Sequence, residues 1–154
     1  KIINKRDYLW ATHLWNMFDF AADARNQGGE PGMNHKGMVT FDRKTKKDSF
    51  YLYKAYWSGE PFVHICGKRF LKRTQKTAII KIYSNQNSVK LYNNGNLLSE
   101  KKGDKIFTFE ITLSQKNSLK AVSGNLTDEA EIILVKQKEK AYKLKKSNNK
   151  SWEK

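Results

Sequence analysis

The sequence predicts a mainly β fold, in which an immunoglobulin-like antiparallel β-sandwich follows a single β-loop-α unit. From Pro61 onward, apolar and polar residues alternate in short segments. Turns separate these segments roughly every 8 to 12 residues, as in sandwich domains. Before Pro61 the pattern differs, because one nearly continuous apolar segment, a long polar loop and a helical pattern follow one another.

The β-loop-α unit begins with the segment WATHLWNMFDF, residues 10 to 20. Its run of apolar residues is typical of a strand that is buried on both faces, as strands of parallel sheets are. Residues 21 to 37 are rich in Gly, Asn and Asp and predict a long loop. A loop of this length in a compact domain is usually functional. Residues 38 to 42, MVTFD, predict a short extended piece.

Residues 44 to 58, KTKKDSFYLYKAYWS, predict a helix. Phe50, Tyr53 and Trp57 recur at helical spacing and form an aromatic stripe with Tyr56 beside them. We expect this stripe to pack in the core. The residues SGEP then end the helix and mark the start of a new region.

The predicted sandwich contains segments with a period of two. In TAIIKIYS, residues 77 to 84, two isoleucines alternate with Lys81 and Tyr83, and KIFTFEITL, residues 105 to 113, alternates in the same way. The tetrapeptide NNGN, residues 93 to 96, predicts a hairpin turn, because type I′ turns need positive φ at both central residues.

Three regions follow from these patterns. Residues 1–58 form the β-loop-α unit, residues 59–135 form the sandwich, and residues 136–154 form a lysine-rich linker or tail. One β-α unit cannot bury its own apolar surface. We therefore expect residues 1–58 to be the end of a larger α/β fold, most simply the eighth strand, loop and helix of a (β/α)8 barrel.

Lysine dominates the net charge of +15, and only five of the 30 basic residues are arginines. The positive excess is spread over all three regions. Diffuse lysine is typical of a solvated surface, and arginine is the better reader of bases and phosphates. We therefore expect no specific nucleic-acid partner. No segment approaches the roughly 18 apolar residues of a membrane helix, so we expect a soluble chain without a membrane span.

Cys66 is the single cysteine, so we expect neither an internal disulfide nor a cysteine-based zinc site. Its apolar neighbours predict a small core residue. His13 and His35 have no third ligand at usable spacing. We therefore assign no metal site, and we expect no cofactor.

Three segments resemble the C-terminal region of glycoside hydrolase family 2, the family of β-galactosidases and β-glucuronidases. They are LWATHLWNMFDF, NHKGMVTFDRKTKKDSFYLYKAYWS and PFVHICGKR. The resemblance is highly specific from Tyr8 to Trp57, and beyond Glu60 it fits the following sandwich more loosely. It implies a parent protein in which a sugar-binding domain and an immunoglobulin-like domain precede the barrel, and in which sandwiches follow it.

The resemblance also implies the chemistry and the site. The parent is expected to hydrolyse terminal β-galactosides with retention, using glutamates on the fourth and seventh barrel strands. Both lie upstream of Lys1, so we assign no catalytic residue to this chain and expect it to be inactive alone. Trp15 aligns with a tryptophan that walls the sugar subsite. Asn34 and Lys36 match an Asn-x-Lys pattern that contacts the substrate carboxylate in β-glucuronidases. Asp42 and Arg43 are expected to fix the loop to the barrel rim.

The amino-acid sequence of residues 15–37 is more similar to the β-galactosidase branch of the family. We therefore expect a β-galactoside to be the carbohydrate partner of the parent. A β-glucuronidase-type parent stays an alternative. So does a non-catalytic carbohydrate-binding sandwich, for which Tyr83, Tyr92 and Phe70 are the candidate aromatic residues. The chain has no initiator Met, so we expect it to be part of a longer protein, bound to the remainder of that parent, and the sequence leaves its compartment open.

Overall fold

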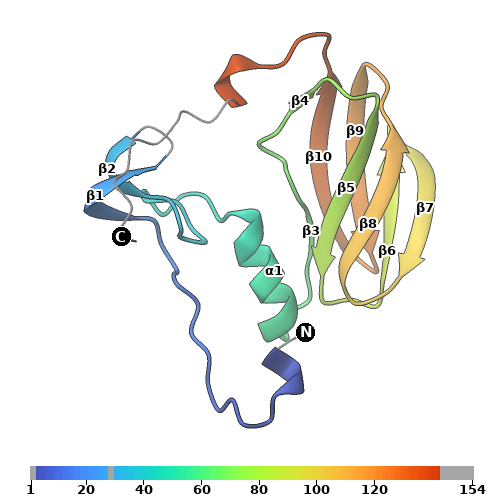
Figure 1. The fold of residues 1–154 in the computed structure, drawn as a ribbon. Coiled ribbons are helices and arrows are strands. Elements are labelled where there is room, and N and C mark those ends of the chain that lie inside the picture. Colours follow the sequence, from blue (N-terminus) through green and yellow to red (C-terminus); the bar gives the residue numbers. More distant parts are fainter. Residues whose placement is uncertain (1–2, 28–29, 143–154) are drawn as a thin grey trace. The chain divides into compact units, whose positions relative to one another are not determined.

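The computed structural model describes residues 3–27 and 30–142 (Figure 1). They form two compact units, one made of residues up to Lys46 and the other beginning at Lys47. Short 3-10 helices lie near the two ends of the described chain, η1 (Ile3–Lys5) and η2 (Lys140–Tyr142). Most of the predicted tail, residues 143 to 154, lies outside the described residues. Within them, no helix has the length and apolar character that a membrane crossing requires.

The second unit contains a β-sandwich of two sheets (Figure 1). One sheet has the strand order β3-β5-β8, with bounds Val63–Ile65, Thr77–Ser84 and Lys105–Thr112. The other has the order β4-β10-β9-β6-β7, with bounds Lys72–Arg73, Leu126–Leu134, Lys116–Ser123, Ser88–Asn93 and Asn96–Lys102. Apart from the parallel pairing of β4 with β10, these strands pair antiparallel. The predicted mainly β fold with an immunoglobulin-like antiparallel sandwich is confirmed.

The core of the sandwich lies between the two sheets. Along β5, Ile80 and Ile82 are buried at 1% and 0% exposure, whereas Lys81 between them is exposed. Leu91 and Leu119 of the facing sheet are also fully buried. Burying a side chain of this size stabilises a fold by about 1.5 to 3 kcal/mol. The predicted period of two is therefore the pattern that fills this core.

The turn between β6 and β7 is the predicted hairpin. Asn94 and Gly95 have φ values of 50° and 83°, so both central residues have the positive φ of a type I′ turn. Asn and Gly tolerate this conformation better than other residues. The connection is therefore specified locally.

The predicted helix is present as α1 (Asp48–Trp57). It packs against the three-stranded sheet through Ala55, which is 1% exposed, with Tyr51 and Leu52 beside it. These residues contact Phe62 and Tyr83 of the sandwich unit. The helix is thus part of the same compact unit as the sandwich.

The expectation that the aromatic stripe of α1 forms core is wrong in this structure. Trp57 and Tyr56 are 64% and 44% exposed, and Phe50 and Tyr53 are half-buried. At 100° per residue, the stripe lies on the opposite side of the helix from the packed Ala55 face. The helix therefore has two apolar faces, and the sandwich covers one of them.

The predicted strand at residues 10–20 is wrong in its bounds. The regular strands of the first unit are β1 (Phe20–Gln27) and β2 (Glu30–Asn34), which form an antiparallel hairpin inside the predicted 21–37 loop. Upstream of β1, the described chain has one isolated parallel bridge, between Phe18 and Val39. A strand of a parallel sheet needs a partner along each edge. In the described chain residues 16–19 have one such partner, residues 38 and 39.

The division between the compact units also differs from the predicted region boundary. The unit that contains the sandwich begins at Lys47, before α1, rather than after residue 58. The assignment of residues 1–58 to a barrel concerns a larger protein and stays a prediction.

Candidate functional site

Two of the three predicted sugar-binding residues lie at the end of β2. Asn34 is its last residue, is 4% exposed, and pairs with Phe20 at the start of β1. The Asn34 side-chain oxygen Oδ1 accepts the backbone N–H of Lys36 at 2.9 Å. This bond closes an Asx turn, a local arrangement that Asn favours. The exposed Lys36 side chain is thus attached to a fixed turn.

Trp15 reaches the same hairpin through Phe20. Its indole is 72% exposed and meets the Phe20 ring edge-on, with ring centroids 5.9 Å apart and an interplanar angle of 90°. The peptide bond between Trp15 and Asn16 is cis. Phe20 therefore contacts Trp15 through its ring and pairs with Asn34 through its backbone, so that two of the predicted residues adjoin the same strand residue.

Asp19 contacts the residues on both sides of Lys36, namely His35 and Gly37. It is 2% exposed, and its Oδ1 accepts the backbone N–H of Gly37 at 2.9 Å. Its Oδ2 lies 3.5 Å from His35 Nδ1, and His35 Nε2 lies 2.9 Å from Glu30 Oε2. Asp19 and Glu30 are thus occupied in holding His35 and the Asn34–Lys36 turn.

Gly37 allows the close approach of the two chain segments. A Cβ at this position would lie 2.0 Å from Asp19 N and 2.1 Å from the carbonyl carbon of Phe18, so no larger residue fits without a backbone shift. Sequence reasoning missed the roles of Asp19 and Gly37. The available signal was an acid between Phe18 and Phe20, since a carboxylate in an apolar run requires buried partners.

Arg43 connects the turn at residues 40–45 to the segment that contains Phe18 and Asp19, and its predicted contact with a barrel rim stays a prediction. Its guanidinium donates to the carbonyl oxygens of Asp19 and Phe41 at 3.2 and 2.8 Å, and lies 4.1 Å above the Phe18 ring centroid. Asp42 accepts the Thr40 hydroxyl at 2.6 Å. This bond, with that of the Lys44 N–H, lowers the pKa of Asp42.

These residues offer binding chemistry rather than a catalytic pair. An exposed indole can cover the apolar face of a sugar ring, and an amide with an ammonium can bind hydroxyls or a carboxylate. The acids in this neighbourhood, Asp19 and Glu30, are engaged with His35 and with the backbone. We therefore assign neither acid a catalytic role.

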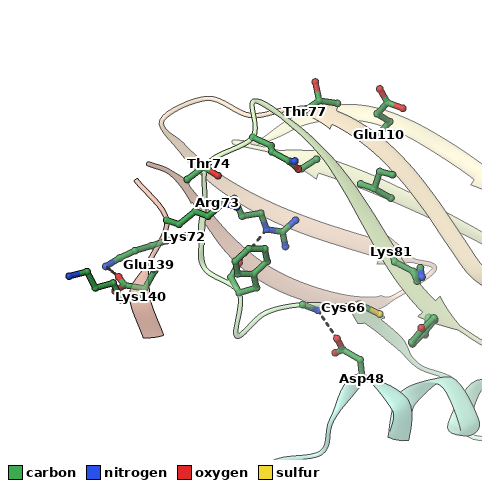
Figure 2. A pocket seen from close by; sticks show the side chains of 17 residues that line it. Asp48, Cys66, Lys72, Arg73, Thr74, Thr77, Lys81, Glu110, Glu139 and Lys140 are labelled. Carbon is green, nitrogen blue, oxygen red and sulfur yellow. Dashed lines mark hydrogen bonds and ion pairs between the residues drawn. The ribbon is translucent and has the colours of Figure 1, made fainter. Parts of the chain in front are cut away.

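A second candidate site lies on the sandwich unit, where a cavity of about 1280 Å³ adjoins the exposed face of β5 (Figure 2). Its basic lining residues are Lys72, Arg73, Lys81, Lys138 and Lys140, and its acidic ones are Asp48, Glu110 and Glu139. One basic and one acidic lining residue form an ion pair with each other, because Lys72 Nζ lies 2.6 Å from Glu139 Oε2. The lining therefore has an excess of positive charge, which the sequence did not reveal because it comes from separate segments.

No family model matches the chain. Among curated proteins, a β-glucuronidase from Bacteroides fragilis is 43% identical over 105 residues, which are 68% of this chain and 15% of that protein. A provisionally named β-glucuronidase from Formosa agariphila is 40% identical over 98 residues, 60% of this chain and 12% of that protein.

Solved structures agree with these similarities. An FMN-binding β-glucuronidase from Faecalibacterium prausnitzii L2-6 is 44% identical, with a TM-score of 0.86 over 90% of this chain and 22% of that one. A provisionally named β-galactosidase from Bacteroides fragilis is also 44% identical, with a TM-score of 0.79 over 86% of this chain and 21% of that one. The chain is related to glycoside hydrolases.

This relation supports the predicted hydrolase class, and the relatives include enzymes named for both expected branches. The chain spans between 12% and 15% of the length of the curated glycoside hydrolases that it matches. Its similarity therefore concerns one region of these enzymes, the region that includes a β-sandwich.

Proposed function

We propose that this chain is part of a retaining family 2 glycoside hydrolase that acts on β-glucuronides. In this proposal Trp15, Asn34 and Lys36 form part of the sugar subsite, and the sandwich is an accessory domain. The two catalytic carboxylates come from the remainder of the parent. The observation that carries the proposal is the Asn34–Lys36 turn, in which the Asn34 amide holds the Lys36 backbone at 2.9 Å.

The turn suits an anionic sugar. Lys36 is exposed, and none of the carboxylates among the described residues forms an ion pair with its ammonium. A β-glucuronide carries a carboxylate that such an ammonium can bind, and hydrogen bonds between ionised partners are about twice as strong as neutral ones. A galactoside offers only hydroxyls at the same place. The names of both curated relatives support this choice.

The β-galactosidase branch, which the sequence favoured, is the second candidate substrate class. One relative with 44% identity bears that name, and Trp15 would pack against either sugar. The exposed Trp57 stripe of α1 supports a larger parent in both cases, because an apolar face of this kind is normally covered.

The carbohydrate-binding sandwich is less well supported by the geometry. It requires aromatic rings exposed on one flat face. Tyr83 is 9% exposed and packs with α1, Tyr92 belongs to the other sheet, and Phe70 lies in the segment before β4. The three candidates therefore form no common platform.

Lys36→Ala in the parent enzyme tests the substrate class. A hydrogen bond to a charged group contributes about 1.5 to 3 kcal/mol. We therefore expect kcat/KM for 4-nitrophenyl β-glucuronide to fall roughly tenfold to a hundredfold, with little change for 4-nitrophenyl β-galactoside. Lys44→Ala, an exposed lysine in the next turn along the chain, is the matched control. A parent that cleaves the galactoside and is indifferent to Lys36→Ala belongs to the other branch.

A second candidate function, FMN binding by the sandwich unit, is supported by the cavity beside β5. A relative with 44% identity is described as FMN-binding, and the basic lining suits a phosphate group. Ile79 and Phe70 add apolar surface for a flavin ring. When bound, FMN would supply redox chemistry that no side chain of this chain provides.

Fluorescence titration of FMN with the 154-residue chain tests this candidate, and riboflavin, which has no phosphate, is the control ligand. We expect FMN to bind more tightly than riboflavin and Lys81→Ala to reduce that preference. Lys116→Ala, an exposed lysine on β9 that is absent from the cavity lining, should leave it unchanged. Equal affinity for the two flavins would exclude phosphate recognition at this cavity.

A further inference from the structure

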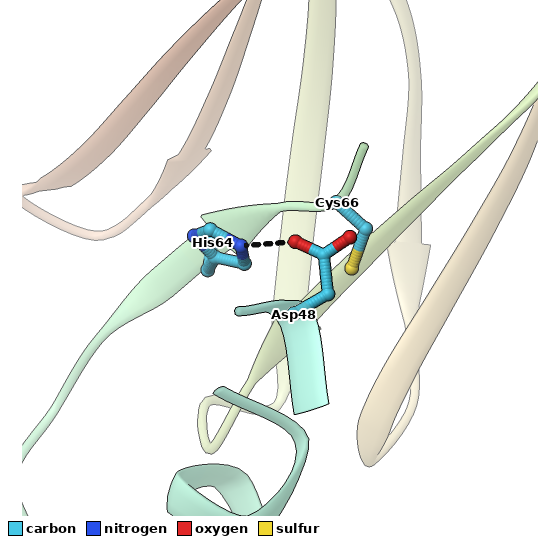
Figure 3. A group of neighbouring side chains, drawn as sticks. All are labelled: Asp48, His64 and Cys66. Atoms are coloured by element: carbon cyan, nitrogen blue, oxygen red, sulfur yellow. Dashed lines mark hydrogen bonds and ion pairs between the residues drawn. The ribbon is translucent and has the colours of Figure 1, made fainter. Parts of the chain in front are cut away.

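Three side chains with metal-ligand chemistry converge where α1 meets β3 (Figure 3). Asp48 is the first residue of α1, His64 lies in β3, and Cys66 follows β3 directly. Their candidate ligand atoms all lie within 4.8 Å of one another. His64 Nε2 and Asp48 Oδ1 are 3.0 Å apart. The adjacent atoms of the cluster are therefore close enough to share one small ion after a slight shift.

We propose that Asp48, His64 and Cys66 bind a divalent transition-metal ion, with Zn²⁺ as the best match. One carboxylate oxygen, one imidazole nitrogen and one thiolate sulfur are ligands that Zn²⁺ accepts in a tetrahedral site. Three protein ligands leave the fourth position for water or another small ligand, an arrangement typical of reactive rather than purely structural zinc sites.

The surroundings of His64 resemble the outer shell of a metal site. While Nε2 faces Asp48, Nδ1 lies 3.7 Å from Asp128 Oδ2. A carboxylate that accepts the second ring N–H of a ligating histidine orients the ring and increases its basicity, and Asp128 Oδ2 would need to move a few tenths of an ångström closer to accept it. Asp128 is itself fixed, because its oxygens accept the Ile65 backbone N–H at 2.7 Å and the Lys68 ammonium at 2.5 Å.

The other two ligands are also held in place. Asp48 Oδ2 accepts the backbone N–H of Gly67 at 2.8 Å, which leaves Oδ1 to face the cluster. The Tyr51 ring stacks on the His64 imidazole, with centroids 3.5 Å apart and planes 9° from parallel. Such fixed side chains lose little conformational freedom when an ion binds.

An ion can reach the cluster from solvent. Asp48 and Cys66 both line the cavity beside β5, where Figure 2 shows them at its edge. Binding forms a metal–sulfur bond and releases the thiol proton of Cys66 to solvent, with no change of oxidation state.

Cobalt substitution in the untagged 154-residue chain tests the proposal, since Co²⁺ occupies zinc sites and reports on its ligands. We expect one Co²⁺ per chain, a sulfur-to-cobalt charge-transfer band in the near ultraviolet, and displacement by Zn²⁺. Cys66→Ser should abolish that band. Asp128→Asn should keep the band and weaken binding about tenfold to a hundredfold, as loss of an outer-shell partner typically does.

His13→Gln is the matched control for His64→Gln, because His13 is exposed and lies in the other unit. His64→Gln should weaken Co²⁺ binding, whereas His13→Gln should not, and circular dichroism checks that each variant is folded. Zn²⁺ should also protect Cys66 of the unaltered chain from alkylation, a measurement that needs no variant. The proposal fails if Co²⁺ binds without a charge-transfer band, or if Zn²⁺ leaves the alkylation rate unchanged.

Discussion

The two units of the chain differ in how far they bury their apolar side chains. In the unit that begins at Lys47, residues such as Ile82, Leu91 and Leu119 are fully buried between two sheets. In the unit up to Lys46, Val39 is buried at 4% exposure, whereas Trp10 and Trp15 are 95% and 72% exposed. The sandwich unit has a complete apolar core although α1 also exposes Trp57 at 64%, whereas the first unit buries little apolar surface besides Val39 and exposes most of its large apolar side chains.

This contrast separates what stabilises the chain from what could bind sugar. Exposed clusters of large apolar residues mark surfaces that contact a ligand or another part of a protein. The buried groups of the first unit are largely polar, since Asp19 and Asn34 are buried and hydrogen-bonded to backbone N–H groups. They hold a turn in place, whereas the sandwich holds itself together by burial.

Separating the units gives the largest expected effect. Residues 47–142 alone should unfold cooperatively in urea with nearly the midpoint of the 154-residue chain, because their core is complete. Residues 1–46 alone should show no cooperative transition. Residues 59–142, which lack α1, should be less stable because Phe62 and Tyr83 lose their helix contacts. Cooperative unfolding of residues 1–46, followed by circular dichroism, would contradict the contrast between the units.

Truncating a core residue should have the next largest effect. Ile82→Ala removes a side chain with 0% exposure, and such changes lower the free energy of unfolding by about 2 to 5 kcal/mol. Ile79→Ala, in the same strand at 64% exposure, is the matched control and should cost less than about 1 kcal/mol. Met17→Ala in the first unit should behave like the control. Urea titrations measure all three, and a large effect of Met17→Ala would mean that the first unit has a core of its own.

Trp15→Ala should affect function rather than stability. Contact of an indole with a sugar ring is worth roughly 1 to 3 kcal/mol, so kcat/KM of the parent enzyme should fall about tenfold to a hundredfold. Trp10→Ala, at 95% exposure, is the control. The unfolding midpoint of the 154-residue chain should not change. Unaltered kinetics in a folded Trp15→Ala parent would place this tryptophan outside the subsite.

The smallest expected effect is a pH dependence confined to the sandwich unit. Burial alone would raise the pKa of Asp48, but hydrogen bonds from His64 and Gly67, with the charges of His64 and Arg69, outweigh it and lower the pKa. A lowered carboxyl pKa stabilises the folded chain at pH values above 3.8, the ordinary pKa of the group. This stabilisation is lost as the pH falls through the pKa of the folded state.

Denaturant titrations between pH 6 and pH 3 measure this dependence. The measurements are made in a buffer that contains a chelator and no added metal ion. The free energy of unfolding of the unaltered chain should fall with pH more steeply than that of the Asp48→Asn variant. Asp104→Asn removes an exposed acid of the same unit and should retain the slope of the unaltered chain. An identical slope for Asp48→Asn would show that the carboxyl contributes nothing to folding.

Local patterns predicted the sandwich because each of them is set by neighbours in sequence. Ile80 and Ile82 face one side of β5 simply because successive residues of a strand alternate, and Asn94–Gly95 turns because of its own backbone preferences. The three proposed site residues were also found from sequence, through their resemblance to a family. Their assignment to a sugar subsite stays a prediction, although Trp15 contacts the Phe20 ring and Asn34 pairs with Phe20 in the hairpin.

Local patterns failed where two segments decide the outcome together. Residues 10–20 have the composition of a buried strand, but a strand forms only where edges are available to pair with, and here residues 38 and 39 supply the one described pairing. The aromatic stripe of α1 is real, yet the helix packs through Ala55 on its other side. Helical periodicity identifies an apolar face and says nothing of which surface will cover it.

The sequence by itself determined the sandwich, its hairpin, the presence of α1 and the relation to glycoside hydrolases, because these depend on side-chain periodicity, turn preferences and contiguous motifs. Tertiary structure alone decided that Asp48, His64 and Cys66 converge, and that Gly37 lies against Asp19. Both arrangements join residues from separate segments at distances of a few ångströms. Such contacts are set by the packing of whole elements against one another, which no spacing along the chain encodes.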